Sequence, residues 1–302
     1  MDPLIIVFGF GVGVLVGLTG MGGGSLMTPL LVLVFGIKPV VAVGSDLAYA
    51  AITKTVGGWR HLRHGTVDMS LSTWICFGSV PAAVLGVYVL EAIERAAGDE
   101  FDDFMLFFLA GALLFTGTAV LLRALFARTL IDRERFDPTT RNKVAAVILG
   151  AFVGFVLGIT SAGSGTLIAV GLIFIFHLAP RQVVGTDVFQ AAVLLWAAAA
   201  AHIVSGNVDW ALVGTILLGS LPGVWLGSHW VTKVRVEALR LALAIVLIGA
   251  GLGLLTKAGV DIPTPILAGV PIVLVLVVGG KQRAERRREV ALRTAAPESP
   301  VG

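Results

Sequence analysis

Two aspartates lie inside long apolar stretches of this sequence, and each one follows a glycine and a hydroxyl residue. Asp46 lies in VVAVGSDL, and Asp187 lies in QVVGTDVF. A charged side chain is costly to bury in an apolar segment, so its default interpretation is a functional one. Each carboxylate could carry a proton, bind backbone N–H groups or pair with a basic side chain. The sequence leaves proton-coupling and structural roles open for both.

Two glycine clusters, GLTGMGGGSLMTP and GITSAGSGTLIAV, are the second feature that could bind a ligand. The residue after the last glycine of each cluster is expected to start a helix, where free N–H groups and the helix dipole favour an anion. The alternative is that the glycines only permit close packing of helices. The predicted substrate-binding residues are Gly22, Gly23, Gly24, Ser25, Gly163, Ser164, Gly165 and Thr166.

Lys54 and Gln190 are two further polar residues in apolar segments. Lys54 could attract an anionic substrate, or it could extend its ammonium group to the membrane edge near Arg60. Gln190 could hydrogen-bond a ligand or the backbone. We include Lys54 and Gln190 among the predicted substrate-binding residues.

Enzyme motifs are missing from the sequence. The stretches HLRHGTVD and HIVSGNVD are interpreted as helix-ending turns, and their histidines do not have the spacing of a metal site such as HExxH. GMGGGSL lacks the lysine of a phosphate-binding loop, and no GxSxG is present. We therefore predict no catalytic residue, no metal and no cofactor, and we disfavour an ATP-driven pump.

The elements that must position these residues are membrane segments. The chain has 302 residues, of which 57% are hydrophobic and 14% charged, and its mean hydropathy is +0.95. This composition indicates a chain surrounded mostly by lipid. Apolar segments cover 4–19, 22–36, 41–59, 69–90, 104–126, 144–160, 161–178, 183–204, 210–231, 238–256 and 264–280.

The charges between these segments predict an orientation. Four connections are basic, namely 60–64, 123–143, 233–235 and the tail after 281, whereas the 91–103 loop is acidic. Basic loops favour the cytoplasm, so the N-terminus is expected outside and the C-terminus in the cytoplasm. The expected partners are membrane lipids and a small anion, without nucleic acid, and a homo-oligomer is left open.

The sequence contains an internal repeat with an offset of 141 residues. The offset aligns Asp46 with Asp187, Pro39 with Pro180 and His61 with His202 without a gap. About a third of the positions between 13 and 86 are identical to their partners, which chance does not explain. Each half holds five segments, and this odd number predicts that the halves enter the membrane from opposite sides.

We therefore predict an all-α, polytopic membrane protein with two inverted repeats of five segments and glycine-rich broken or re-entrant hairpins. An extra C-terminal helix follows the repeats. The predicted divisions are a first repeat at 1–126, a basic cytoplasmic linker at 127–143, a second repeat at 144–256, the extra helix at 257–280 and a disordered, charged cytoplasmic tail at 281–302.

The pattern GLTGMGGGSLMTPLLVLVFGIKPVVAVGSDL, followed by HLRHGTVD and GSVPAAVLG, resembles the sulfite exporter TauE/SafE family. The resemblance extends over roughly residues 4–256. It implies an inner-membrane transporter of small sulfur-containing anions such as sulfite, thiosulfate or sulfonates. The second half has Ser161 and Ser164 where the first has Gly20 and Gly23, so the two half-sites differ chemically.

The leading hypothesis is a secondary transporter of such anions, coupled to protons or to the membrane potential. One alternative is a transporter of an unrelated solute such as a cation, with Asp46 and Asp187 as ligands. Another is a membrane accessory protein without transport activity. An intramembrane enzyme is the weakest hypothesis, because no nucleophile and base are paired in the sequence.

Overall fold

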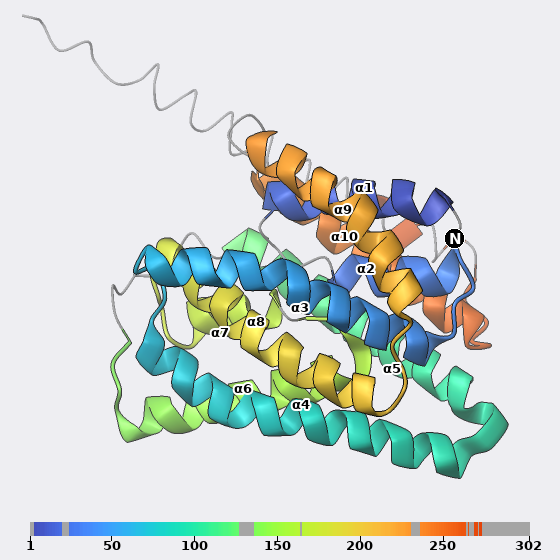
Figure 1. The fold of residues 1–302 in the computed structure, drawn as a ribbon, viewed down its shortest axis with the longest axis horizontal. Coiled ribbons are helices and arrows are strands. Elements are labelled where there is room, and N and C mark those ends of the chain that lie inside the picture. Colours follow the sequence, from blue (N-terminus) through green and yellow to red (C-terminus); the bar gives the residue numbers. More distant parts are fainter. Residues whose placement is uncertain are drawn as a thin grey trace, which may run out of the picture.

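A computed structural model describes residues 3–19, 24–126, 136–163, 165–230, 236–263, 265, 269–270 and 272–273. In this part of the chain the secondary structure is helical, without strands (Figure 1). The first half holds α1 (Pro3–Thr19), α2 (Gly24–Leu33), α3 (Pro39–Arg63), α4 (Met69–Ala97), the short 3-10 helix η1 (Gly98–Glu100) and α5 (Phe101–Phe126). The second half holds α6 (Thr140–Thr160), α7 (Leu167–Phe174), α8 (Pro180–Val204), α9 (Trp210–Trp230) and α10 (Val236–Lys257).

The helices that follow the glycine clusters are short. α2 has 10 residues and α7 has 8. At 1.5 Å per residue they are about 15 Å and about 12 Å long, roughly half of a bilayer's hydrocarbon core. Each is followed by a long helix of 25 residues, α3 or α8. The prediction of glycine-joined segments too short to cross the membrane separately is therefore confirmed for α2 and α7, but it is wrong for α6, which has 21 residues and is long enough to cross.

The same local signals start the equivalent helices in both halves. Pro39 and Pro180 occupy the first turns of α3 and α8, where the missing N–H of proline has no cost. Asp68 caps the start of α4, because its carboxylate accepts a hydrogen bond of 3.0 Å from the Leu71 N–H. α9 begins in the same way, because Asp209 accepts from the Leu212 N–H at 3.0 Å. These contacts confirm that HLRHGTVD and HIVSGNVD are turns followed by an aspartate cap.

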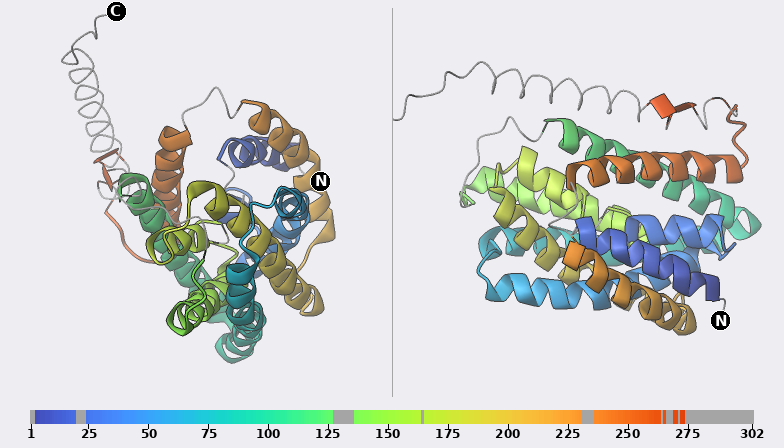
Figure 2. Two further views of the ribbon diagram at one scale, coloured as in Figure 1. Left: turned by 90° about the vertical axis from the view of Figure 1, so that its left-hand side faces the viewer. Right: turned by 90° about the horizontal axis from the view of Figure 1, so that it is seen from above.

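The two halves exchange their contacts. α1 packs along α9, and its counterpart α6 packs along α4 (Figure 2). α3 packs against its own counterpart α8, and α5 against its counterpart α10. Contacts of this reciprocal kind are those of an isologous interface, so the halves are related by a pseudo-two-fold axis.

The pairing of α3 with α8 is antiparallel and locates this axis. Gly44 lies against Asn207 at one end of the pair, and Gly185 lies against Thr66 at the other. Between them the Trp196 indole N–H donates a hydrogen bond of 2.8 Å to the Thr55 hydroxyl. Thr55 and Trp196 are equivalent at the 141-residue offset, so the pseudo-two-fold axis passes between these two residues.

Hydroxyl groups beside the two aspartates connect the halves. The Asp209 N–H donates to the Ser45 hydroxyl at 2.9 Å, and the Asp68 N–H donates to the Thr186 hydroxyl at 2.9 Å. Ser45 and Thr186 directly precede the aspartates in the repeated motif. The spacing repeated in each half therefore places a hydroxyl group that hydrogen-bonds the other half.

Within the described part of the chain, five helices are long and apolar enough to cross a membrane, namely α4, most of α5, α6, α8 and α9. α1 is a shorter apolar helix. The tail predicted at 281–302 lies outside the described residues, as do half of the residues of the extra helix at 257–280 and residues 127–135 of the predicted linker.

Candidate functional site

Asp46 is the most completely enclosed carboxylate of the candidate site. Its side chain is fully buried in α3, and its Oδ2 atom accepts hydrogen bonds from the hydroxyls of Thr28 at 2.6 Å and Ser161 at 2.8 Å. Thr28 belongs to α2, and Ser161 ends α6 in the other half. Asp46 lies in the interior of α3, so it does not cap its own helix and instead connects three elements.

The second glycine cluster forms the turn that leads from α6 to α7. Ser161 has a left-handed backbone with a φ of 58°, and Gly163 has a φ of 96°, a conformation that glycine adopts without strain. Thr166 then occupies the position directly before α7, and its side-chain hydroxyl does not cap the helix. The Ser161 hydroxyl bonded to Asp46 thus fixes this turn against the first half of the protein.

Two buried hydroxyls next to this turn have no hydrogen-bond partner among the described residues. They belong to Thr166, which is 4% exposed, and to Thr116 of α5, which is fully buried. A Cβ atom placed on Gly163 would lie 3.6 Å from the Thr116 Oγ1 atom, so Thr116 borders the turn. Buried hydroxyls usually have a hydrogen-bond partner, and the described residues supply none for these two.

Lys54 lies on α3 next to the residue that marks the pseudo-two-fold axis. The side chain is only 8% exposed, and its Nζ atom has no hydrogen-bond partner within the described part of the chain. The ammonium group therefore does not reach the surface. The alternative interpretation, in which Lys54 extends to the membrane edge, is wrong. Asp187 of α8 interacts with Lys54 electrostatically. The equivalent of Lys54 in the second half is Leu195, so the second half has no counterpart of this ammonium group.

Gln190 is hydrogen-bonded within the protein. Its amide nitrogen donates to the Ser79 hydroxyl of α4 at 2.7 Å, and its amide oxygen is buried without a described partner. The equivalent residues in the other half are Tyr49 and Ser220, which are also buried. Gln190 therefore holds α8 to α4 and has one acceptor left for a ligand.

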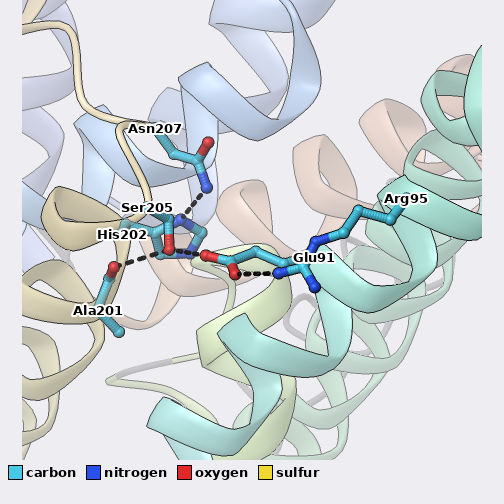
Figure 3. A network of polar contacts seen from close by, with 6 residues as sticks. All are labelled: Glu91, Arg95, Ala201, His202, Ser205 and Asn207. Atoms are coloured by element: carbon cyan, nitrogen blue, oxygen red, sulfur yellow. Dashed lines mark hydrogen bonds and ion pairs between the residues drawn. The ribbon is translucent and has the colours of Figure 1, made fainter.

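The turn after α8 is held by a separate polar network (Figure 3). Glu91 of α4 accepts from the Ser205 hydroxyl and forms an ion pair with Arg95 at 3.1 Å. His202 is buried, and its Nε2 atom lies 2.8 Å from the Gly158 carbonyl, so this nitrogen donates. Asn207 is 3.3 Å from the other ring nitrogen. His202 thus connects this turn to the end of α6 and has a structural role.

The structure tests the positions of only some predicted binding residues. Gly24 begins α2, Gly165 lies in the turn before Thr166, and Gly163, Thr166 and Lys54 lie as described above. The positions of Gly22, Gly23 and Ser164 and the side chain of Ser25 lie outside the described residues. Their binding roles stay predictions.

Sequence reasoning missed two polar residues of the site. Thr28 bonds Asp46, and Thr116 borders the second glycine turn. A lone threonine in an apolar segment often bonds its own helix, as the Thr215 hydroxyl does to the Ala211 carbonyl at 2.7 Å. No sequence signal separates Thr28 and Thr116 from such residues.

Two other kinds of site do not occur with suitable chemistry in the described structure. A cavity of about 190 Å³ lies between α1, α2 and α10, and its lining is entirely apolar, so it offers no ligand for an anion. Among the described residues, no group of three or more histidine, cysteine or acidic side chains has the geometry of a metal site. The polar groups near the axis and the second glycine turn are therefore the candidate site.

Comparison with known proteins identifies the relatives of this chain. A family model described as sulfite exporter TauE/SafE matches residues 5–254. The probable membrane transporter protein YjnA of Bacillus subtilis is 36% identical over 256 residues, which cover 84% of this chain and 100% of YjnA. The probable membrane transporter protein YdhB of the same organism is 28% identical over 252 residues, covering 83% and 99% of the two chains. No solved structure is a significant match.

Proposed function

Because this chain belongs to the sulfite exporter TauE/SafE family, and is therefore a membrane transporter and not an enzyme, we propose that it carries small anions by alternating access. The proposed substrates are sulfur-containing oxyanions and sulfonates. The substrate site lies near the membrane midplane, between the two glycine turns. The two halves are inverted relative to each other. The protein lies in the inner membrane, with its N-terminus outside and its C-terminus in the cytoplasm.

The buried ammonium group of Lys54 is the observation that carries this proposal. It has no hydrogen-bond partner within the described residues and lies beside the pseudo-two-fold axis. In an inverted repeat this axis runs in the membrane plane, so a group beside it is equally far from both surfaces. A positive charge at that depth favours an anionic substrate over a cation, because a bound anion offsets the cost of burying the ammonium group.

The second glycine turn supplies the hydrogen-bond donors that an oxyanion requires. The unpartnered hydroxyls of Thr166 and Thr116 lie in this turn or next to it. The donors around the turn support an anion site better than a carboxylate site for a metal cation.

Transport by purified protein in liposomes tests the proposed substrate class. Liposomes preloaded with sulfite, thiosulfate or isethionate should exchange this anion for labelled external anion, and preloading with potassium or sodium chloride should give no exchange. Lys54→Leu gives position 54 the same residue as its equivalent position in the second half, Leu195, and it should abolish exchange. Exchange of all three anions at the wild-type rate by Lys54→Leu would contradict the proposal.

Thr166→Val tests the hydroxyl donors without removing an internal hydrogen bond. We expect the dissociation constant of the anion to rise about tenfold to a hundredfold, as for the loss of one hydrogen bond to a charged group. Protein stability should not fall, because the hydroxyl has no partner to lose among the described residues. The control is Thr215→Val in α9, whose hydroxyl bonds its own helix and which should leave anion affinity unchanged.

A further inference from the structure

The apolar cavity between α1, α2 and α10 opens on the surface of the protein. Two of its lining residues, Leu33 of α2 and Val246 of α10, are exposed, so the cavity continues into the apolar surface that faces lipid. An apolar cavity of roughly 150 Å³ stays dry and takes up benzene. This cavity of about 190 Å³ therefore suits a hydrocarbon ligand and not water.

The internal repeat does not explain this cavity, because the two halves differ here. Leu30 of α2 lines the cavity, and its equivalent in the second half is Gly171 of α7. A Cβ atom on Gly171 would lie 2.4 Å from a methyl carbon of Leu149, so Leu149 packs directly on α7. The equivalent of Leu149 is Phe8, whose ring packs edge-on against Phe35 at a centroid distance of 5.4 Å. The cavity thus belongs to the first half.

Two exposed lysines lie at the end of α2, next to the cavity. The ammonium group of Lys257, the last residue of α10, donates a hydrogen bond of 2.7 Å to the Val32 carbonyl, one residue before the lining of the cavity. Lys38 follows Ile37, whose N–H donates to the Leu31 carbonyl at 3.0 Å. The chain therefore folds back at the end of α2 and brings Lys38 to the same end as Lys257.

Neither lysine is neutralised by the protein. Among the described residues no ion pair joins Lys38 or Lys257 to a carboxylate, and the exposed Asp261 forms none either. The Lys257 ammonium group has three N–H donors and uses one of them for Val32. Two positive charges, with donors to spare, therefore lie at one end of an apolar cavity.

We propose that the cavity and the two lysines bind one anionic phospholipid. An acyl chain occupies the space between α1, α2 and α10, and the phosphate group lies at Lys38 and Lys257. About 10 Å of helix separates Lys257 from Ala250, a lining residue of α10, so the cavity lies deeper in the membrane than the lysine. An acyl chain lies deeper than its phosphate group in the same way. The lysines select a negatively charged headgroup over a zwitterionic one.

Native mass spectrometry of the full-length protein in neutral detergent tests the site with phosphatidylglycerol. The wild type should retain one phosphatidylglycerol per chain and should bind phosphatidylcholine more weakly. Replacing both lysines (Lys38→Gln with Lys257→Gln) should weaken phosphatidylglycerol binding about thirtyfold, since each basic residue near the membrane surface contributes about fivefold. The control Arg181→Gln removes an exposed charge in the first turn of α8 and should bind as the wild type does.

A phosphatidylglycerol that carries a diazirine in one acyl chain locates the bound chain. In phosphatidylcholine vesicles containing this probe, irradiation should cross-link it to lining residues of α2 and α10, such as Leu33 and Val246. Ala242→Phe places a ring in the cavity and should remove these cross-links. The matched control is Ala200→Phe, at an exposed position of α8, which should retain them.

Three results would overturn this site. They are equal retention of the two phospholipids by the wild type, unchanged binding by the variant without both lysines, and cross-links spread evenly over the lipid-exposed helices. If that variant does not fold, Lys38→Gln alone decides, because it removes no described hydrogen bond and should weaken binding about fivefold.

The reactivity of Val246→Cys in a Cys76→Ala background separates lipid from protein as the occupant. N-ethylmaleimide should react quickly with this cysteine in lipid-free detergent and more slowly after phosphatidylglycerol is added. Equally slow reaction with and without the lipid would show that protein covers the cavity, either residues 264–280 of this chain or a second copy, and would contradict the proposal.

Discussion

Ser161 shows how one side chain changes the interpretation of a repeated motif. Its equivalent in the first half is Gly20, so the serine looks like a difference between two half-sites. In the structure its hydroxyl bonds Asp46 in the other half, 115 residues away. The hydroxyl is therefore used to fix the second glycine turn, and it is not free to bind an anion. Among the described residues at this turn, the hydroxyls of Thr166 and Thr116 are the ones without a hydrogen-bond partner.

Ser161→Ala should lower the free energy of unfolding by about 1.5–3 kcal/mol, because a buried carboxylate loses one of its two hydroxyl donors. Serine and alanine both carry a Cβ atom, so the left-handed backbone at this position is equally strained in both. Unfolding in mixed detergent micelles measures the change. Ser228→Ala removes an exposed hydroxyl that bonds the Trp225 carbonyl and should change stability little. Equal losses for the two variants would contradict this role.

Close contact between α4 and α6 depends on glycine. A Cβ atom on Gly154 of α6 would overlap the backbone carbonyl of Ser79 in α4. The equivalent glycine, Gly13 of α1, lies in the same way against Ser220 of α9. Small residues allow membrane helices to approach until their backbones touch, and packing at this distance stabilises their association. Both pairs join one half of the protein to the other.

Gly154→Ala should lower stability by about 1–3 kcal/mol, because the added methyl group forces α4 and α6 apart. Thermal unfolding in detergent would show a lower midpoint. The matched control is Gly111→Ala in α5, where a Cβ atom meets nothing within 4 Å. That variant should be neutral or stabilising by up to about 1 kcal/mol, since alanine favours helix more than glycine does. A neutral Gly154→Ala would show that the helices have room to separate.

At the scale of the whole molecule, the antiparallel contact of α3 with α8 supports inverted halves. Equivalent helices that pack antiparallel around a two-fold axis expose equivalent turns at opposite ends. The turn after α3 begins at His64, and the equivalent turn after α8 begins at Ser205, directly after Val204, the last residue of α8. In a membrane these two turns would lie on opposite faces, the first in the cytoplasm and the second outside.

Cysteine labelling of intact cells measures this arrangement. In a Cys76→Ala background, Val204→Cys should react with a membrane-impermeant maleimide from outside, because its side chain is 80% exposed in the turn predicted to be external. His64→Cys, also exposed, should react only after the cells are made permeable. Labelling of both positions from the same side would contradict the inverted arrangement and, with it, the midplane location of Lys54.

The amino-acid sequence by itself determined the helical membrane class, the repeat and the half-length segments after the glycine clusters. Apolar content, turn residues and the 141-residue offset are local or additive properties of the chain, so they can be read without coordinates. The family was also visible from the arrangement of these motifs, and the match over residues 5–254 confirms it.

Only the tertiary structure decided what each polar side chain contacts. The sequence placed Asp46 and Asp187 at equivalent positions, and it could not show that Thr28 and Ser161 reach the first of them. The sequence also left open whether the Lys54 side chain extends to the membrane edge or stays in the interior. The structure places this side chain in the interior. The physical reason is that hydrogen-bond partners and burial depend on which helices pack together, and residues more than 100 positions apart come into contact only through that packing.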